Sequence, residues 1–153
     1  MANSIEIRGL DELIRRMQQF PERLEASMRE TMQAALLTLW ENVPPYPAPP
    51  AGSSYDRTGT LGRTLGSGEG GGTGGGQPDV YEVREMGSGF EGQFGTNLDY
   101  APYVIGDEEQ NPYHTVNGWW RMSFIKNRAQ EKIEGLFNTM GEKIAEFLEG
   151  KGG

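Results

Sequence analysis

The chain has 153 residues, a formal net charge of −8 and no cysteine. The lack of cysteine excludes a disulfide framework, a thiol nucleophile and a cysteine-ligated zinc site. The acidic balance argues against a surface that coats nucleic acid, because phosphate neutralisation needs clustered Lys and Arg. Leu, Ile, Val and Phe together number 29, which is few for a self-sufficient core. We therefore expect a subunit that finishes burying its surface against neighbours.

The N-terminal part of the sequence predicts a short strand and two helices. Apolar and polar residues alternate over 4–8, which favours a strand or arm. Apolar residues then recur at helical spacing over 10–20. A longer stripe from Leu24 to Val43 predicts an amphipathic helix that ends before Pro44. No apolar run is long enough to span a bilayer, and residues 1–6 do not resemble a signal peptide, so we expect no membrane association.

Two segments of biased composition follow. Residues 44–50 contain five prolines, so 44–56 is expected to form a stiff, extended arm. Residues 66–76 contain eight glycines, so 66–78 is expected to form a flexible loop. Between them, Leu61 and Leu65 predict a helical turn that anchors this region to the core, and Gly59 and Gly62 permit a tight backbone there.

The C-terminal half predicts a hairpin and a third helix. Residues 79–86 and 90–94 have strand character and flank a Gly-Ser-Gly turn. The pattern does not decide the form of 98–105, and 106–118 is expected to be a polar loop. From Ile125 onward the helical period continues to Gly150. The order predicts one α+β domain over 1–153, with a small antiparallel sheet packed against a long N-terminal helix and a C-terminal helix, and with long Pro-rich and Gly-rich loops.

The acidic side chains are concentrated in one part of the chain. Residues 79–120 carry eight acidic side chains and one basic side chain, whereas the other segments are close to neutral. One interpretation is an ordinary solvated face. The other is a directed negative field that repels phosphates or receives a basic partner.

No combination of residues predicts catalysis. His114 is the only histidine and cannot form a metal site alone. The acidic residues 107–109 are consecutive and lack the spacing of a calcium loop. No Lys-Ser or Lys-Thr follows the Gly-rich loop, so it does not match a phosphate-binding loop. We expect no catalytic residue, cofactor or metal. Trp119 and Trp120 are adjacent, so at least one of them is expected near the surface or at an interface.

Four features, in order along the chain, resemble one protein family. They are Gly-Leu-Asp-Glu-Leu at 9–13 after a short strand, Tyr-Asp-Arg-Thr-Gly-Thr-Leu-Gly-Arg at 55–63 after the Pro-rich stretch, Tyr-Ala-Pro-Tyr-Val at 100–104 after Gly-Thr-Asn, and Gly-Trp-Trp at 118–120 before the last helix. Together they resemble the head–tail joining proteins of tailed bacteriophages, the tail-completion or neck group that includes minor tail protein Z-like chains. Two features depart from that family: the loop at 66–76 is unusually rich in glycine, and Ile105-Gly106-Asp107-Glu108 replaces the usual Glu-Phe-Gly-Thr.

The resemblance implies a structural virion protein rather than an enzyme. Such proteins are made in the bacterial cytoplasm and form a ring, usually of six copies, at the head–tail interface. The partners implied are further copies of the chain, the head-side connector or stopper proteins, and the tail tube or terminator proteins. DNA would pass through the lumen without sequence-specific binding. The acidic segment 79–120 could line that channel, because like charge disfavours phosphate adhesion.

Thirteen residues are expected at interfaces, on the strength of the resemblance and of their residue types. They are Tyr46, Tyr55, Arg57, Thr58, Gly59, Leu61, Arg63, Tyr100, Pro102, Tyr103, His114, Trp119 and Trp120. Two alternatives remain open at this point. One is a tail terminator that caps the tail tube, and the other is a soluble non-viral adaptor that binds Pro-rich or basic partners. An enzyme is the least favoured class.

Overall fold

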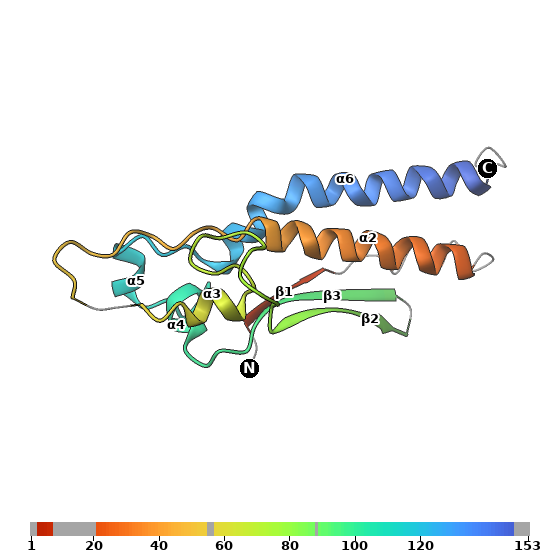
Figure 1. Ribbon diagram of the computed structural model, residues 1–153. Helices are drawn as coiled ribbons and strands as arrows, with labels where there is room; N and C mark the ends of the chain where they lie inside the picture. Colours follow the sequence, from red (N-terminus) through yellow and green to blue (C-terminus); the bar gives the residue numbers. More distant parts are fainter. Residues whose placement is uncertain (1–2, 8–20, 55–56, 88, 149–153) are drawn as a thin grey trace.

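The computed structural model describes residues 3–7, 21–54, 57–87 and 89–148 (Figure 1). The helix predicted over 10–20 lies outside these residues. The described elements, in chain order, are β1 (Asn3–Ile7), α2 (Pro21–Glu41), α3 (Thr60–Thr64), β2 (Val80–Met86), β3 (Gly89–Thr96), α4 (Ala101–Ile105), α5 (Pro112–Val116) and α6 (Met122–Leu148).

The three strands form one antiparallel sheet in the order β1-β3-β2. The predicted hairpin of β2 and β3 is confirmed, and the central strand β3 also pairs with β1. Phe94 of β3 lies opposite Ile5 of β1 and Tyr81 of β2, so the three side chains share one face. Alternate residues of each strand point to the same side, and on this side they include Ile5, Phe94 and Tyr81, so the face is largely apolar.

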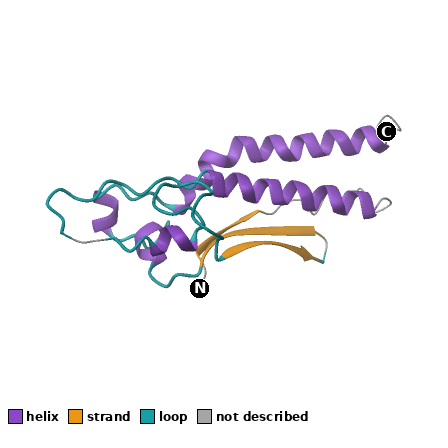
Figure 2. Cartoon of the chain, in the orientation of Figure 1, coloured by secondary structure: helices purple, strands orange, loops and turns teal. Residues whose placement is uncertain are grey.

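Helices α2 and α6 cover this apolar face, which confirms the predicted α+β class (Figure 2). The apolar stripe of α2 lies against the sheet, and Met28, Met32 and Leu36 are almost completely buried. The fit over the central strand is close, since a Cβ at Gly92 would lie 2.8 Å from the Met32 sulfur. We refer to β1, α2, β2, β3 and α6 together as the body.

The core consists of two buried clusters along the body. The larger cluster lies toward the C-terminal end of α2 and includes Leu39, Phe94, Ile105 and Ile125. The predicted anchors Leu61 and Leu65 belong to it, which explains why α3 is held against the body. The smaller cluster lies toward the other end of α2 and contains Leu24, Met28, Met32, Phe90 and Met140.

The Gly-rich segment is not the flexible loop that its composition predicts. Its ends close through a bridge between Leu65 and Pro78. Its backbone is also tied to the arm, because the N–H of Gly72 donates to the carbonyl of Val43 at 3.0 Å and the N–H of Tyr46 donates to that of Glu69 at 2.8 Å. The prediction was wrong because glycine also permits backbones to approach one another closely, which creates these hydrogen bonds.

The polar loop predicted over 106–118 also requires correction. It contains the short helix α5, in which Pro112 occupies the first turn and the Asn111 side chain accepts a hydrogen bond from the N–H of Tyr113 at 2.9 Å. The undecided segment 98–105 contains α4, which also has a proline in its first turn. Both helices lie beyond the end of the sheet, next to the Pro-rich arm (Figure 1).

Candidate functional site

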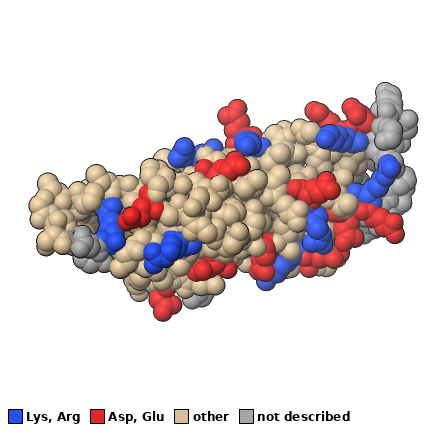
Figure 3. Space-filling view, in the orientation of Figure 1, with Lys and Arg blue, Asp and Glu red and all other residues tan. Residues whose placement is uncertain are grey.

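The end of the molecule that carries α5 differs in chemistry from the body. We define the tip as residues 44–54 and 111–120, which the fold brings together (Figure 1). None of these residues is Lys, Arg, Asp or Glu, although such residues make up 24% of the chain. In Figure 3 this end of the surface is mostly uncharged, whereas blue and red atoms are spread over the body. The tip is therefore the part of the protein where another surface meets the least charge.

A pocket of about 140 Å³ opens between the tip and the segments next to it. Eight of the thirteen predicted interface residues line it, although they come from distant parts of the sequence. The fold has therefore brought the Arg-Thr-Gly-x-Leu and Tyr-Ala-Pro-Tyr-Val motifs to one place. The eight residues are Tyr46, Arg57, Thr58, Gly59, Leu61, Tyr100, His114 and Trp119.

Four other predicted interface residues lie outside the pocket lining. Arg63 supports its rim, because its guanidinium donates to the carbonyl of Thr58 at 2.8 Å. The Trp120 indole N–H donates to the carbonyl of Pro45 at 3.2 Å, so Trp120 fastens the arm. Pro102 lies in the first turn of α4, and Tyr103 is 56% exposed on the same helix. The remaining residue, Tyr55, lies outside the described residues.

Arg57 holds one wall of the pocket by stacking on aromatic rings. Its guanidinium carbon lies 5.7 Å from the centroid of the Tyr46 ring and 5.3 Å from that of Trp119. The two rings are themselves 4.8 Å apart. One guanidinium nitrogen donates to the carbonyl of Pro47. Because the cation–π contacts and this hydrogen bond act together, Arg57 fixes the arm against Trp119. We refer to the adjacent Trp119 and Trp120 as the Trp pair.

Tyr46 joins the arm to α3. Its hydroxyl accepts a hydrogen bond of 2.6 Å from the backbone N–H of Gly62. Burial raises the pKa of the Tyr46 hydroxyl, while the Gly62 hydrogen bond acts in the opposite direction. Only glycine fits at 62, since a Cβ there would lie 2.4 Å from the carbonyl oxygen of Gly68. The predicted tight backbone is confirmed at Gly62 and also at Gly59, whose φ is 71°.

Gln110, next to the tip, joins the tip to α4 in a way that sequence reasoning missed. Its side-chain N–H groups donate to the carbonyls of Val104 at 2.8 Å and Trp119 at 3.1 Å. Its carbonyl oxygen accepts from the Arg121 guanidinium and from the Thr115 hydroxyl, each at 2.9 Å. Gln110 thus links α4, α5 and the Trp pair. A glutamine in a polar loop has no periodicity that would reveal such a role.

His114 is a wall residue with one buried nitrogen. Its ring lies edge-on to Tyr113 at 5.3 Å and to Trp119 at 6.2 Å between centroids. Within the part of the chain that the structure describes, its Nδ1 is buried and has no hydrogen-bond partner. Burial lowers the pKa of His114 below its ordinary value of 6.5, which favours the neutral imidazole. A neutral ring packed among aromatic rings suits a recognition surface.

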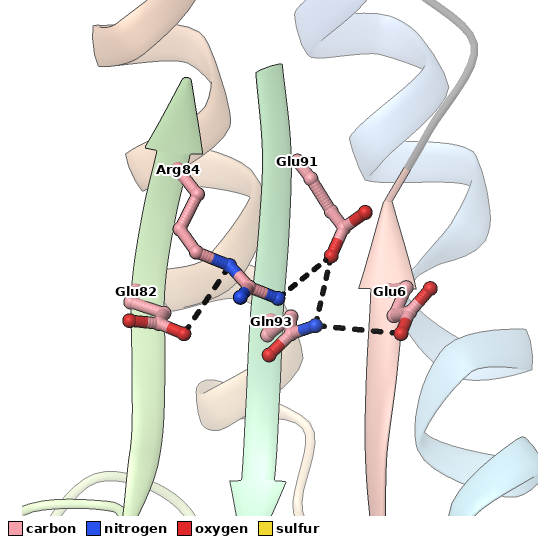
Figure 4. Close-up of polar contacts among 5 residues, drawn as sticks. All are labelled: Glu6, Glu82, Arg84, Glu91 and Gln93. Carbon is pink, nitrogen blue, oxygen red and sulfur yellow. Dashed lines mark hydrogen bonds and ion pairs between the residues drawn. The ribbon is translucent and has the colours of Figure 1, made fainter. Parts of the chain in front are cut away.

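On the acidic face of the sheet, Arg84 pairs with two carboxylates. Figure 4 shows Arg84 between Glu82 and Glu91, with N–O distances of 3.4 Å and 3.0 Å. Gln93 donates to Glu91 at 2.8 Å and to Glu6 at 3.3 Å. These contacts connect the five side chains across the three strands. The Glu91 side chain, on the central strand, is only 4% exposed. Within the described part of the chain, this network joins three carboxylates to one guanidinium.

Two features that would indicate other functions are missing from the described residues. No group of three or more His, Asp and Glu residues in the described ranges could hold a metal ion. Among the helices of the same ranges, none has both the length and the apolar character that crossing a bilayer requires.

Comparisons with known proteins identify no relative. No protein-family model matches the chain, and neither the curated proteins nor the solved structures contain a significant match.

Proposed function

We propose that this chain is a structural subunit of the neck of a tailed bacteriophage, where it completes the tail or connects head and tail. Copies would form a ring, usually of six, between the head-side connector or stopper proteins and the tail tube or terminator. The protein would act by shape and surface complementarity rather than by catalysis. The virion would be its working location.

The tip is the observation that carries this proposal. Tyr, Trp and Arg are enriched at protein interfaces, whereas Lys, Glu and Asp are depleted there. The tip contains two tyrosines and two tryptophans and no Lys, Glu or Asp. Large side chains there are exposed: Tyr113 to 60% and Val116 to 84%. Three of the four motifs that carry the resemblance to neck proteins contribute residues to the same pocket, and the motif at 9–13 lies outside the described residues. A surface of this kind is suited to contact with protein.

The acidic sheet face fits a position next to DNA. Residues 79–120 carry eight acidic side chains and one basic side chain, so a surface formed by them would repel phosphates and let DNA slide. This lining remains a prediction. An assembled ring in which that face points outward would contradict it.

The proposal is tested by placing a charge in the tip. Val116→Asp adds a carboxylate at an exposed position without removing a buried group, and Leu37→Asp on α2 is the control at 41% exposure. We expect Val116→Asp to block ring formation and the production of infectious particles, because a desolvated charge at an interface is costly. Light scattering and negative-stain electron microscopy measure assembly. A wild-type chain that stays monomeric at all concentrations and is absent from purified particles would refute the proposal.

Two other functions are separated by further observations. A tail terminator has a similar size, and its position would be recognised by imaging an intact particle. The aromatic pocket supports the second alternative, a soluble adaptor for Pro-rich partners, because aromatic grooves recognise such segments. An adaptor would be monomeric and would need no ring.

A further inference from the structure

We propose that the tip pocket binds an extended, uncharged, proline-bearing segment of a partner protein. The inference rests on the proposed function in one respect, since that partner would be another component of the same assembly. It identifies the chemistry by which the partner is held. Four properties of the pocket support it: its walls, its charge, its free donors and the fixed position of the chain's own arm.

The walls suit a ring-shaped apolar side chain. Tyr46, Tyr100, Tyr113 and Trp119 line the pocket together with prolines of the arm. Its volume is about 140 Å³. An apolar cavity of roughly 150 Å³ accommodates a benzene-sized molecule, so this space is sufficient for one proline ring or aromatic ring. Aromatic faces and proline rings pack together well in Pro-rich recognition.

The charge of the pocket disfavours ionic ligands. No Asp, Glu or Lys is among the described residues that line it. Among the described lining residues the charged one is Arg57, which stacks on Tyr46 and Trp119 and donates to the carbonyl of Pro47. The guanidinium is therefore engaged in holding the wall. An uncharged segment enters without an unpaired charge on either side.

Three of the residues that line the pocket also carry hydrogen-bond donors. Within the described residues, the Trp119 indole N–H and the hydroxyls of Tyr100 and Tyr113 have no hydrogen-bond partner. A polyproline II segment has complementary groups, because its backbone carbonyls make no internal hydrogen bonds. Donors of this kind, placed between aromatic faces, give such segments both affinity and direction.

The chain's own Pro-rich arm is not free to be the occupant of a second copy's pocket. Tyr46 is bound through its hydroxyl to Gly62 and through its N–H to Glu69. The carbonyls of Pro45 and Pro47 accept from Trp120 and Arg57. Docking this arm into another copy would break these bonds. These bonds favour a segment of a different protein as the occupant.

Titration of the full-length chain with a blocked octaproline peptide tests the inference. Chemical shifts of the ¹⁵N-labelled protein are followed, with the Trp119 indole N–H as the reporter. We expect saturable shifts confined to pocket residues. Tyr100→Ala is expected to weaken binding about tenfold, through loss of one aromatic contact and one donor. Trp119→Phe, which keeps a ring and removes the indole donor, should also weaken it.

The matched control is Tyr103→Ala, since Tyr103 is exposed on α4 and does not line the pocket. It should bind octaproline like the wild type. Three results would overturn the inference: no saturable shift at millimolar peptide, equal binding of a Gly-Ser peptide or a Glu-rich peptide, and self-association that depends on Tyr100, which would make a second copy the occupant. The titration needs no virion, so octaproline binding by a protein that is absent from phage particles would refute the proposed function alone.

Discussion

The body and the tip are stabilised in different ways. The body is regular, with a periodic apolar stripe on each long helix and charged side chains on its solvent face. The tip is irregular and uncharged, and it is held by hydrogen bonds between side chains and backbone groups and by stacked rings. Apolar burial in the body is shared by many residues, whereas the order of the tip depends on a few. The structural role of each residue therefore depends on the region to which it belongs.

The largest expected effect is on the body. Leu39 is fully buried in the larger cluster, whereas Leu37 on the same helix is 41% exposed. Leu39→Ala is expected to lower the free energy of unfolding by about 2–5 kcal/mol through lost burial and a cavity. Leu37→Ala should change it by less than about 0.5 kcal/mol. Urea denaturation followed by circular dichroism measures both. Equal effects would contradict the assignment of the core.

A smaller effect is expected in the Gly-rich segment that supports the tip. A Cβ at Gly75 would lie 2.1 Å from the backbone nitrogen of Gly68, whereas a Cβ at Gly74 would meet nothing within 4 Å. Gly75→Ala is expected to destabilise the fold by about 1–3 kcal/mol, since backbone atoms must move. Gly74→Ala is the control and should be close to neutral. Thermal unfolding compares the two variants. If both were neutral, the segment would be looser than the structure indicates.

Gln110→Ala tests whether the tip can lose order while the body remains. The variant leaves the carbonyls of Val104 and Trp119 without their donor, which is expected to cost about 1–2 kcal/mol. Amide hydrogen exchange should accelerate in α4 and α5 and stay unchanged in β3. Gln130→Ala, which removes one contact with Glu134 on α6, is the control. Equal acceleration in the tip and the body would show that the two regions unfold as one unit.

The smallest expected effect is the pH dependence of His114. Its pKa is lowered in the folded protein by burial, so the unfolded chain binds the proton more readily. Stability should therefore fall as the pH drops through 6.5, the ordinary value, and this loss should level off below the folded pKa. His114→Gln should remove this component, because the chain has no other histidine. Thermal unfolding at about pH 7.5 and about pH 5.5 measures it. An unchanged pH profile in the variant would contradict this role.

The elements of the body could be predicted because their patterns are local. Alternation identified β1, β2 and β3, and the apolar stripes identified α2 and α6. Alternation alone did not establish that β1 pairs with β3, since a strand of five residues has no signal for its partner. The short helices α4 and α5 were missed because one turn of helix carries too few residues for a period. They are held by Gln110 and by the Asn111 cap.

Most of the candidate site could be named from the sequence, but its arrangement could not. The residue types and the resemblance selected Tyr46, Arg57, Tyr100 and Trp119, and the structure places all four around one pocket. Neither source of information predicted that Arg57 would stack on two aromatic rings. The Arg57–Trp119 contact joins residues 62 positions apart, and it depends on the path of the arm and of the Gly-rich segment.

The sequence by itself determined the α+β class, the long helices, the hairpin and the uncharged composition of residues 44–54 and 111–120. These properties follow from residue types and from periods of two or about 3.6 residues, which act over short distances along the chain. Only the tertiary structure decided that the Gly-rich segment packs against the arm, that Gln110 links α4 to the Trp pair, and that the two uncharged segments meet in one tip. The physical reason is that these contacts are made by backbone groups and single polar side chains, whose partners are chosen by proximity in the fold.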